Sequence, residues 1–393
     1  MKRTIVILLI LLSAFFSKAQ KITLNGYVKD MEGIYVFENA IPMPAGEKLK
    51  HTSYNLVHNR LNFRAYPTNN ITVALEMRNR LFSGNLINKI PGYSAQIAKD
   101  NGFVDLSWNL TEQEKWFVNT TIDRIFIDYT KGDWQVRAGR QRINWGINMV
   151  WNPNDIFNAF SYIDFDYEER PGSDAILVTY YPNFSSSIDL AYKAADAFTN
   201  TAFAAKYRFN LKNYDIQFIA GQAGNDFVFG GGWSGFIGGM SFRGEGSFFT
   251  PLPSKKYVSE NAFTGTVSLD YTFNNSLYLH TSFLYNSNGT TTKGESFSLL
   301  DPGYQLSAKN LSIGKYELFG QASYPLNPLI KTGLAAMMNL SDQSMYIGPS
   351  ASISLHNNLE LFLMSQVMLG ETGSEYAATG NIYAYFGRLR WSF

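Results

Sequence analysis

Three arginines lie close together in the chain, just before a segment that is both acidic and aromatic. The arginines are Arg137, Arg140 and Arg142. The segment 146–173 carries five carboxylates, which are Asp155, Asp164, Asp166, Glu168 and Glu169. Where an acidic loop faces a basic wall across a narrow passage, the field between them sorts ions and solutes by charge. A second interpretation stays open, in which these charges form salt bridges that only hold the segment in place.

The same segment is too aromatic to lie free in water. It holds six aromatic residues, Trp151, Phe157, Phe160, Tyr162, Phe165 and Tyr167. We expect it to fold back against the interior of the protein and to narrow the passage there. Along a strand, Arg137 differs in parity from the other two arginines. A β-bulge near Ala138-Gly139 would turn all three toward the passage.

The elements that would position these residues are β-strands, because apolar and polar residues alternate along most of the chain. In one run, Ile71, Val73, Leu75 and Met77 alternate with Thr72, Glu76, Arg78 and Arg80. Similar runs recur about a dozen times, each about 9–13 residues long, which is the length that a tilted membrane strand needs. A period of two without a helical period predicts an all-β fold.

The connections between these runs are of two sizes. Short turns lie at 67–70, 130–133, 182–183, 211–213, 274–275, 326–328 and 356–358, and long segments at 83–116, 146–173, 249–260, 287–312 and 370–380. Outer-membrane barrels have short periplasmic turns and long outer loops. We therefore expect a transmembrane antiparallel up-and-down β-barrel of about 18 strands, with 16 as the alternative. The count depends on the glycine-rich stretch 230–239, where the alternation is interrupted.

The composition is typical of an exported protein that could be embedded by strands. Residues 1–19 combine basic Lys2 and Arg3 with an apolar stretch and small residues, which predicts a signal peptide for Sec-type export and a single barrel domain over 20–393. The remaining chain is close to neutral, so nothing indicates a nucleic-acid partner. The chain has no cysteine, which excludes a disulfide framework. Aromatic residues make up 16% of it, as two aromatic girdles at the membrane surfaces require.

Charged side chains on the other strands are expected to face the interior. Arg124 and Asp128 have the parity opposite to Ile125 and Ile127. A basic side chain that faced lipid at mid-membrane would cost about 2–4 kcal/mol. The full set expected to line or constrict the lumen is Arg124, Asp128, Arg137, Arg140, Arg142, Asp155, Asp164, Asp166, Glu168, Glu169, Arg388 and Arg390.

The last strand resembles a known class of segment. Residues 381–393 read N-I-Y-A-Y-F-G-R-L-R-W-S-F, with an aromatic or apolar residue at nearly every second position up to Phe393. This resembles the closing strand of bacterial outer-membrane barrels, which the barrel assembly machinery recognises. The resemblance implies that Trp391 and Phe393 belong to the assembly signal.

A second resemblance covers about 20 residues of the basic and acidic region. Gly139-Arg140-Gln141, Trp145-Gly146 and Asn152-Pro153-x-Asp155 are similar to a block in porin-like barrel families of Gram-negative bacteria, many of them uncharacterised. The Ala19-Gln20 junction and the abundance of Asn and Tyr resemble secreted proteins of Bacteroidota. The porin-like family implies passive diffusion of small hydrophilic solutes through an outer-membrane channel, here narrowed by 146–173, without a cofactor or metal. Its expected partners are outer-membrane lipids, the assembly machinery, the solutes and, in a homotrimer, further copies of the chain.

Two other classes of function stay open. A non-conducting outer-membrane barrel could serve as a surface-binding or structural protein through its long loops. A barrel enzyme would need a nucleophile and a base, for which His280 with Ser276, Ser282 and Asp270 is a candidate. No nucleophile elbow or phosphate-binding loop occurs in the sequence, and we expect no enzymatic activity.

Overall fold

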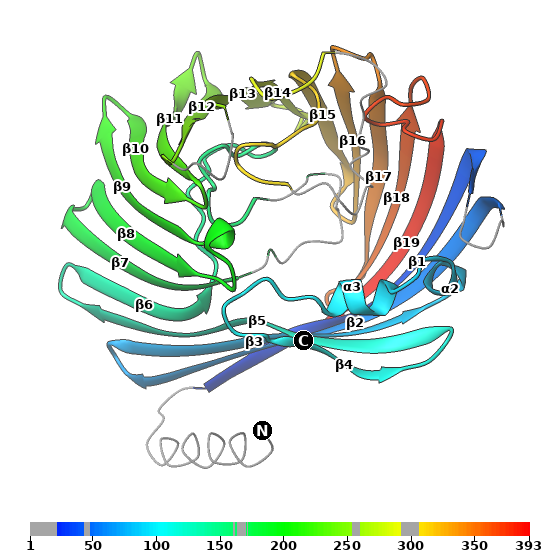
Figure 1. Ribbon diagram of the computed structural model, residues 1–393, viewed down its shortest axis with the longest axis horizontal. Helices are drawn as coiled ribbons and strands as arrows, with labels where there is room; N and C mark the ends of the chain where they lie inside the picture. The colour runs from blue at the N-terminus through cyan, green and yellow to red at the C-terminus, as the bar shows by residue number, and fades with distance from the viewer. Residues whose placement is uncertain are drawn as a thin grey trace.

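The strands close into one antiparallel barrel (Figure 1). The structure, a computed structural model, describes residues 22–42, 48–159, 162, 170, 172–253, 260–291 and 306–393. The predicted signal peptide, 1–19, lies outside the described residues, as do Asp164, Asp166, Glu168 and Glu169.

In the described part of the chain, 18 strands form the wall. They are β1 (Ile22–Pro42), β2 (Lys48–Thr68), β3 (Ile71–Ser83), β5 (Trp116–Lys131), β6 (Trp134–Gln141), β7 (Ser173–Asn183), β8 (Ser186–Ala194), β9 (Ala202–Leu211), β10 (Tyr214–Ala223), β11 (Asp226–Ile237), β12 (Met240–Pro251), β13 (Ala262–Thr272), β14 (Tyr278–Asn286), β15 (Tyr316–Asn327), β16 (Ile330–Asn339), β17 (Met345–His356), β18 (Leu359–Leu369) and β19 (Ile382–Ser392). A further strand, β4 (Ser107–Glu112), pairs with the first half of β5 and β6 pairs with the second half, so β4 and β6 share one place in the order. The expected count of 18 is confirmed, and the alternative of 16 is wrong.

The two ends of the chain close the ring. β19 pairs with β1 from Tyr27 opposite Ser392 to Phe37 opposite Ile382. The backbones of Gly26 and Phe393 exchange two hydrogen bonds of 3.0 Å. Closure matters because a sheet in lipid can leave no backbone N–H or C=O group unpaired.

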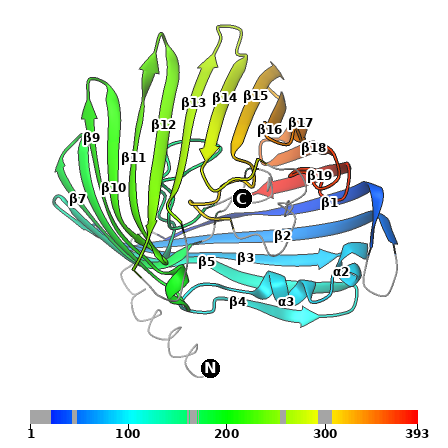
Figure 2. The same ribbon diagram turned by 45° about the horizontal axis from the view of Figure 1, so that its top comes forward.

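Short turns gather at one end of the barrel and long loops at the other (Figure 2). The short turns expected from the sequence lie at the end where Phe393 lies, and the long segments connect strands at the opposite end. We call these the turn end and the loop end. The glycine-rich stretch forms β11 and a turn at Gly238 and Gly239, whose φ values of 56° and 86° are left-handed values that glycine adopts freely.

The two faces of the wall have opposite chemistry. On β13, Phe263 and Val267 are exposed on the outer face, while Thr264, Thr266 and Ser268 are buried on the inner face. Exposed apolar side chains cover the outer face of other strands too, among them Ile176, Leu190, Phe218, Phe229, Leu318 and Leu363. An apolar exterior around a polar interior is the arrangement that lipid requires of a barrel. Within the described ranges, no helix is long and apolar enough to cross a membrane.

Short helices lie in connections at the loop end. α2 (Asn85–Lys89) and α3 (Tyr93–Ala98) follow β3, and η3 (Phe198–Asn200) follows β8. The first two pack on the inner face of β2, β3 and β5, through an apolar cluster of Leu56, Phe82, Ile87, Tyr93, Ile97 and Phe117. They therefore narrow this side of the lumen.

Candidate functional site

The segment 142–159, which follows β6, runs along the inside of the barrel (Figure 2, teal). Near its start it lies beside β10, where Gln217 Nε2 donates a hydrogen bond of 2.7 Å to the carbonyl of Trp145. It continues past β12, where the backbone N–H of Ile147 donates to Glu245 Oε2 over 2.8 Å. Because Glu245 follows Ile147 by 98 positions, this contact joins parts of the chain that are far apart in sequence.

The farthest part of the segment lies against β15. The ring of Trp151 is edge-on to Phe319, with 6.4 Å between centroids, and Trp151 is buried. Tyr162 approaches the same Phe319 ring, with centroids 4.8 Å apart. Val150 and Trp151 join a buried cluster built from the strands β14 to β19, which includes Leu284, Phe319, Met337, Tyr346, Met368 and Ile382.

The segment then returns along the wall to β8. Asn154 accepts a hydrogen bond of 2.8 Å from Ser247 and donates one of 3.0 Å to the carbonyl of Gly231. The carbonyl of Phe157 accepts a bond of 3.0 Å from Lys193 Nζ. The described residues 142–159 therefore lie inside the barrel, as expected from their aromatic content, and cover the inner wall from β8 to β15. We call them the inner loop.

Of the five carboxylates predicted to act in the segment 146–173, Asp155 lies among the described residues. It is fully buried, and this burial raises its pKa to about 7. Arg142, Arg170 and Lys193 lower the pKa, as does a backbone hydrogen bond from Asn158, but these effects are smaller than that of burial. The charge of the inner loop therefore changes near neutral pH.

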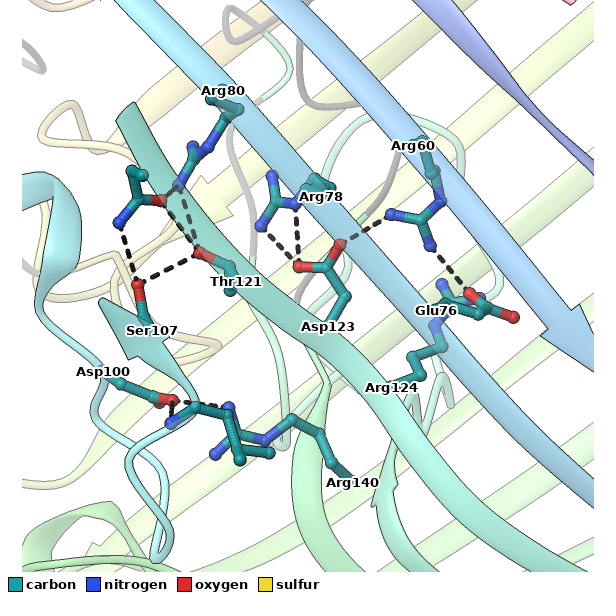
Figure 3. Close-up of polar contacts among 12 residues, drawn as sticks. Arg60, Glu76, Arg78, Arg80, Asp100, Ser107, Thr121, Asp123, Arg124 and Arg140 are labelled. Carbon is teal, nitrogen blue, oxygen red and sulfur yellow. Dashed lines mark hydrogen bonds and ion pairs between the residues drawn. The ribbon is translucent and has the colours of Figure 1, made fainter. Parts of the chain in front are cut away.

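On the opposite wall, charged side chains form a connected set (Figure 3). Asp123 pairs with Arg60 over 2.6 Å and with Arg78 over 2.5 Å. Glu76 pairs with Arg60 over 2.7 Å and with Arg124 over 2.9 Å. Arg60 is fully buried between the two carboxylates. We call these five residues the ion-pair ladder.

A β-bulge in β5 builds this ladder. Glu76 lies opposite Arg124 and the next residue, Met77, lies opposite Ile122, so Asp123 is the extra residue. Asp123 and Arg124 therefore both reach the lumen, although they are consecutive. The sequence carries a signal for this bulge, since strict alternation after Ile122 would turn one of two successive charges toward lipid. The sequence prediction placed the bulge in the next strand and did not identify Asp123 or Arg60 as lumen residues.

Further charges line a cavity of about 570 Å³ at the turn end of the lumen. Arg137 Nη2 lies 2.5 Å from Asp128 Oδ2, and both side chains reach this cavity. Arg124 and Arg142 line it as well. Other residues in its wall are Arg64, Tyr66, Thr72, Glu76, Gln135 and Asn144.

The lumen position expected for Arg140 is wrong. β6 pairs with β5 and β7 without a shift in register, so it has no bulge at Ala138-Gly139. Arg140 lies opposite Ile125, which is exposed on the outer face. At the loop end it forms ion pairs of 2.5 Å with Asp100 and 2.7 Å with Asp174, beneath the chain that leads into β4. Arg140 therefore fastens an outer connection and does not line the passage.

The last strand has the expected two faces. Arg388 lies on the inner face beside Phe362, with its guanidinium 4.8 Å from the ring centroid, and Arg390 lies 4.3 Å from the ring centroid of Tyr27. Trp391 and Phe393 are about half exposed on the outer face at the turn end, with their rings 5.3 Å apart. This strand places two basic groups near the lumen and an aromatic pair on the outer face at the turn end.

The candidate enzyme residues do not assemble an outer catalytic site. His280 is buried on the inner face, with its ring 5.3 Å from that of Phe319. Asp270 lies opposite His280 but pairs with Arg243 over 2.7 Å, and Ser282 is hydrogen-bonded to Thr266. Over the described ranges, no group of three or more His, Cys, Asp or Glu side chains could hold a metal ion.

No protein-family model and no curated protein matches the chain. Solved structures do. OccK5 (OpdH) of Pseudomonas aeruginosa has a TM-score of 0.61 at 8% identity, covering 95% of this chain and 98% of that one. OccAB4 of Acinetobacter baumannii has 0.59 at 7% identity, covering 96% and 99%. OccK11 (OpdR) of Pseudomonas aeruginosa has 0.58 at 8% identity, covering 95% and 96%. At such low identity the likeness concerns the fold, and the chain therefore has the porin-like barrel fold of Occ/OprD-type outer-membrane porins.

Proposed function

We propose that the protein is an outer-membrane, porin-like channel through which small hydrophilic solutes diffuse passively. The observation that carries this proposal is the inner loop, which lies within a closed barrel and across from the ion-pair ladder. A barrel of this strand number is wide enough to leave a water-filled lumen. The inner loop, together with α2 and α3, would then set the width of the passage.

The lining of the passage would sort solutes by charge as well as by size. Arg64, Arg124, Arg137 and Arg142 line the cavity at the turn end together with the carboxylates Glu76 and Asp128. A solute that loses part of its hydration there exchanges hydrogen bonds to water for bonds to these groups, which lowers its barrier to passage. Movement is driven by the concentration gradient alone and requires neither a covalent step nor a cofactor.

The route to the membrane belongs to the same proposal. Residues 1–19 would direct Sec-type export and be removed, and the remaining chain would fold in the outer membrane among its lipids. Trp391 and Phe393, which close the barrel against β1, would be the part that the barrel assembly machinery recognises. We further infer a Bacteroidota source, an uncharacterised porin family and a homotrimer, which rest on the sequence resemblances.

Swelling of proteoliposomes tests the proposal. Vesicles that hold the folded protein are expected to swell in isotonic solutions of small sugars and amino acids, faster than protein-free vesicles and more slowly as solute size increases. Arg137→Gln is expected to change the ratio of anionic to cationic amino acid uptake, because it removes a charge from the cavity. Asp133→Asn, in an exposed turn, is the matched control. Folded protein that gives no swelling contradicts the proposal.

A second candidate function is a non-conducting barrel that binds a surface partner or has a structural role. One observation favours it: three connections at the loop end are fastened together by the buried Glu375. This carboxylate accepts hydrogen bonds of 3.0 Å from Ser312, 3.1 Å from the N–H of Ile313 and 2.9 Å from Asn339. A rigid loop end is what a binding surface needs. Folded protein that is silent in the swelling assay would favour this candidate.

A further inference from the structure

Polar side chains occupy the outer face of four neighbouring strands. Asp30 and Glu32 of β1 are exposed there, with the same parity as the exposed Ile34 and Val36. On β2, Asn55 Nδ2 donates hydrogen bonds of 2.7 Å to Asp30 and 2.9 Å to Glu32. The carboxylates are therefore held on the surface in a fixed arrangement.

Amide side chains extend this polar area across β2, β3 and β5. Asn79 Nδ2 donates to Asn59 Oδ1 over 3.3 Å, and the hydroxyl of Thr120 donates to Asn79 Oδ1 over 2.8 Å. Asn59 has the same parity as Asn55 and lies opposite Asn79, which lies opposite Thr120, so all three share the outward face, where Thr120 is buried beneath its neighbours. We call the set Asp30, Glu32, Asn55, Asn59, Asn79 and Thr120 the outward polar patch.

The register places the patch within the apolar band of the barrel. Asp30 lies opposite Leu389, which lies opposite Leu361 on the next strand. Glu32 lies opposite Gly387, with Leu363 beyond it. Leu389 and Leu363 are exposed on the outer face. The two carboxylates are thus level with side chains that face the hydrocarbon region if the barrel spans a membrane.

Strands β13 to β19 provide the contrast. From β13 to β19, outward positions hold apolar, aromatic, small or hydroxyl side chains and no carboxylate or amide. Hydrocarbon offers no hydrogen bonds to replace those that water gives a carboxylate, so charged groups on a lipid face are strongly disfavoured at this depth. The outward polar patch is therefore a poor contact for lipid and a good contact for protein.

We propose that this face is the interface between copies of the protein, and this inference rests on the outer-membrane location proposed above. The patch is self-complementary. Asp30 and Glu32 on β1 retain lone pairs that can accept further hydrogen bonds. Asn59 and Asn79, on β2 and β3, each use one amide hydrogen within the barrel and have a second to donate.

Symmetry brings these complementary groups together. Copies in one membrane share the same orientation, so the axis that relates them runs along the membrane normal. Rotation about that axis sets the β1 side of one copy beside the β3 and β5 side of the next, at the same depth. The carboxylates of one copy then face the amides of its neighbour, in a dimer and in a trimer alike. A different protein could bind here only if it carried its own amide or other hydrogen-bond donors opposite Asp30 and Glu32.

Cysteine cross-linking in membranes tests the interface, because the chain has no cysteine of its own. Asp30→Cys and Asn79→Cys variants, each carrying a different epitope tag, are co-expressed and treated with a short thiol cross-linker. The expected result is a covalent product that carries both tags, with little product from either variant expressed alone. The matched control is Leu279→Cys with Leu334→Cys, also two strands apart and exposed on the outer face.

The outcomes separate the interface from the channel. A mixed product from the patch pair only, lost when Glu32→Leu and Asn59→Leu are added, supports the interface. Equal labelling of both pairs, or a monomer by native mass spectrometry without cross-links, overturns it and assigns the face to lipid. Cross-linking only to a different protein overturns it too. Cross-linked oligomers through which no solute passes would refute the channel and support the interface. Solute passage through a protein that stays monomeric would support the channel and refute the interface.

Discussion

Replacement of Asp123 by asparagine tests whether the ion-pair ladder is a buried, energetically coupled unit. The side chains of Asp123 and Arg60 are 1% and 0% exposed, and the carboxylate lies 2.6 Å from Arg60 and 2.5 Å from Arg78. Each hydrogen bond to a charged group contributes about 1.5–3 kcal/mol, and removal of one partner from a buried pair costs about 3–5 kcal/mol. Because Arg60 keeps its pair with Glu76, we expect a loss near the lower limit, about 3 kcal/mol.

The assay is reversible urea unfolding of the barrel in lipid vesicles, followed by tryptophan fluorescence. Asp270→Asn is the matched control, because Asp270 pairs with Arg243 over 2.7 Å but both side chains are more exposed, at 12% and 21%. The control is expected to lose about 1 kcal/mol. Addition of Arg78→Met to Asp123→Asn is expected to recover part of the loss, since it removes a positive charge from a buried site that has lost a carboxylate. An Asp123→Asn variant within about 0.5 kcal/mol of the wild type would refute the argument.

Three further predictions concern the inner loop and the closing strand. Burial raises the pKa of Asp155 to about 7, so between pH 4 and 7 the folded protein holds a proton that the unfolded chain, with its ordinary pKa of 3.8, has released. The free energy of unfolding should therefore fall as the pH rises from 4 to 7, and it should fall less in Asp155→Asn. An equal pH dependence in both proteins would contradict the raised pKa of Asp155. Trp151→Ala leaves a cavity beside Phe319 and should cost about 3–5 kcal/mol while it widens the passage; unchanged urea midpoint and solute flux would show that this tryptophan does not hold the inner loop. Deletion of Phe393 removes two backbone bonds to Gly26 and should reduce the heat-modifiable barrel in outer membranes, and normal yield would contradict the assembly role.

The strand framework could be predicted from the sequence because its signal is local. A period of two is visible within each run, as in β13, where Phe263 and Val267 alternate with Thr264 and Thr266. The two sizes of connection then gave the strand number and the end at which each loop lies. The inner loop could be predicted to avoid water from its aromatic residues, but its path along β10, β12 and β15 depends on contacts such as that of Ile147 with Glu245, which are remote in sequence.

The candidate site was less predictable from the sequence. Alternation does not show which face a side chain occupies where the strand register shifts, nor whether an outward side chain is buried where another segment covers the wall. Asp123 reaches the lumen through a bulge that alternation alone does not locate. Arg140 has outward parity and is nevertheless buried, because Asp100 and the chain before β4 lie over it. Arg137 and Asp128 lie opposite one another on the inner face and form an ion pair, so strand alternation and the pairing of opposite charges predict the same position for them. Asp164, Asp166, Glu168 and Glu169 lie outside the described residues, and their role at a constriction stays a prediction.

Single-channel conductance in planar bilayers tests whether the inner loop narrows a conducting lumen. The wild-type protein is compared with a variant in which 147–157 is replaced by a short Gly-Ser linker, after both are shown to be folded by heat-modified mobility. We expect a steady conductance for the wild type and a larger, less charge-selective conductance for the variant, because the inner loop narrows the lumen. A folded wild type that conducts no ions, or a variant with the same conductance and selectivity as the wild type, would contradict it.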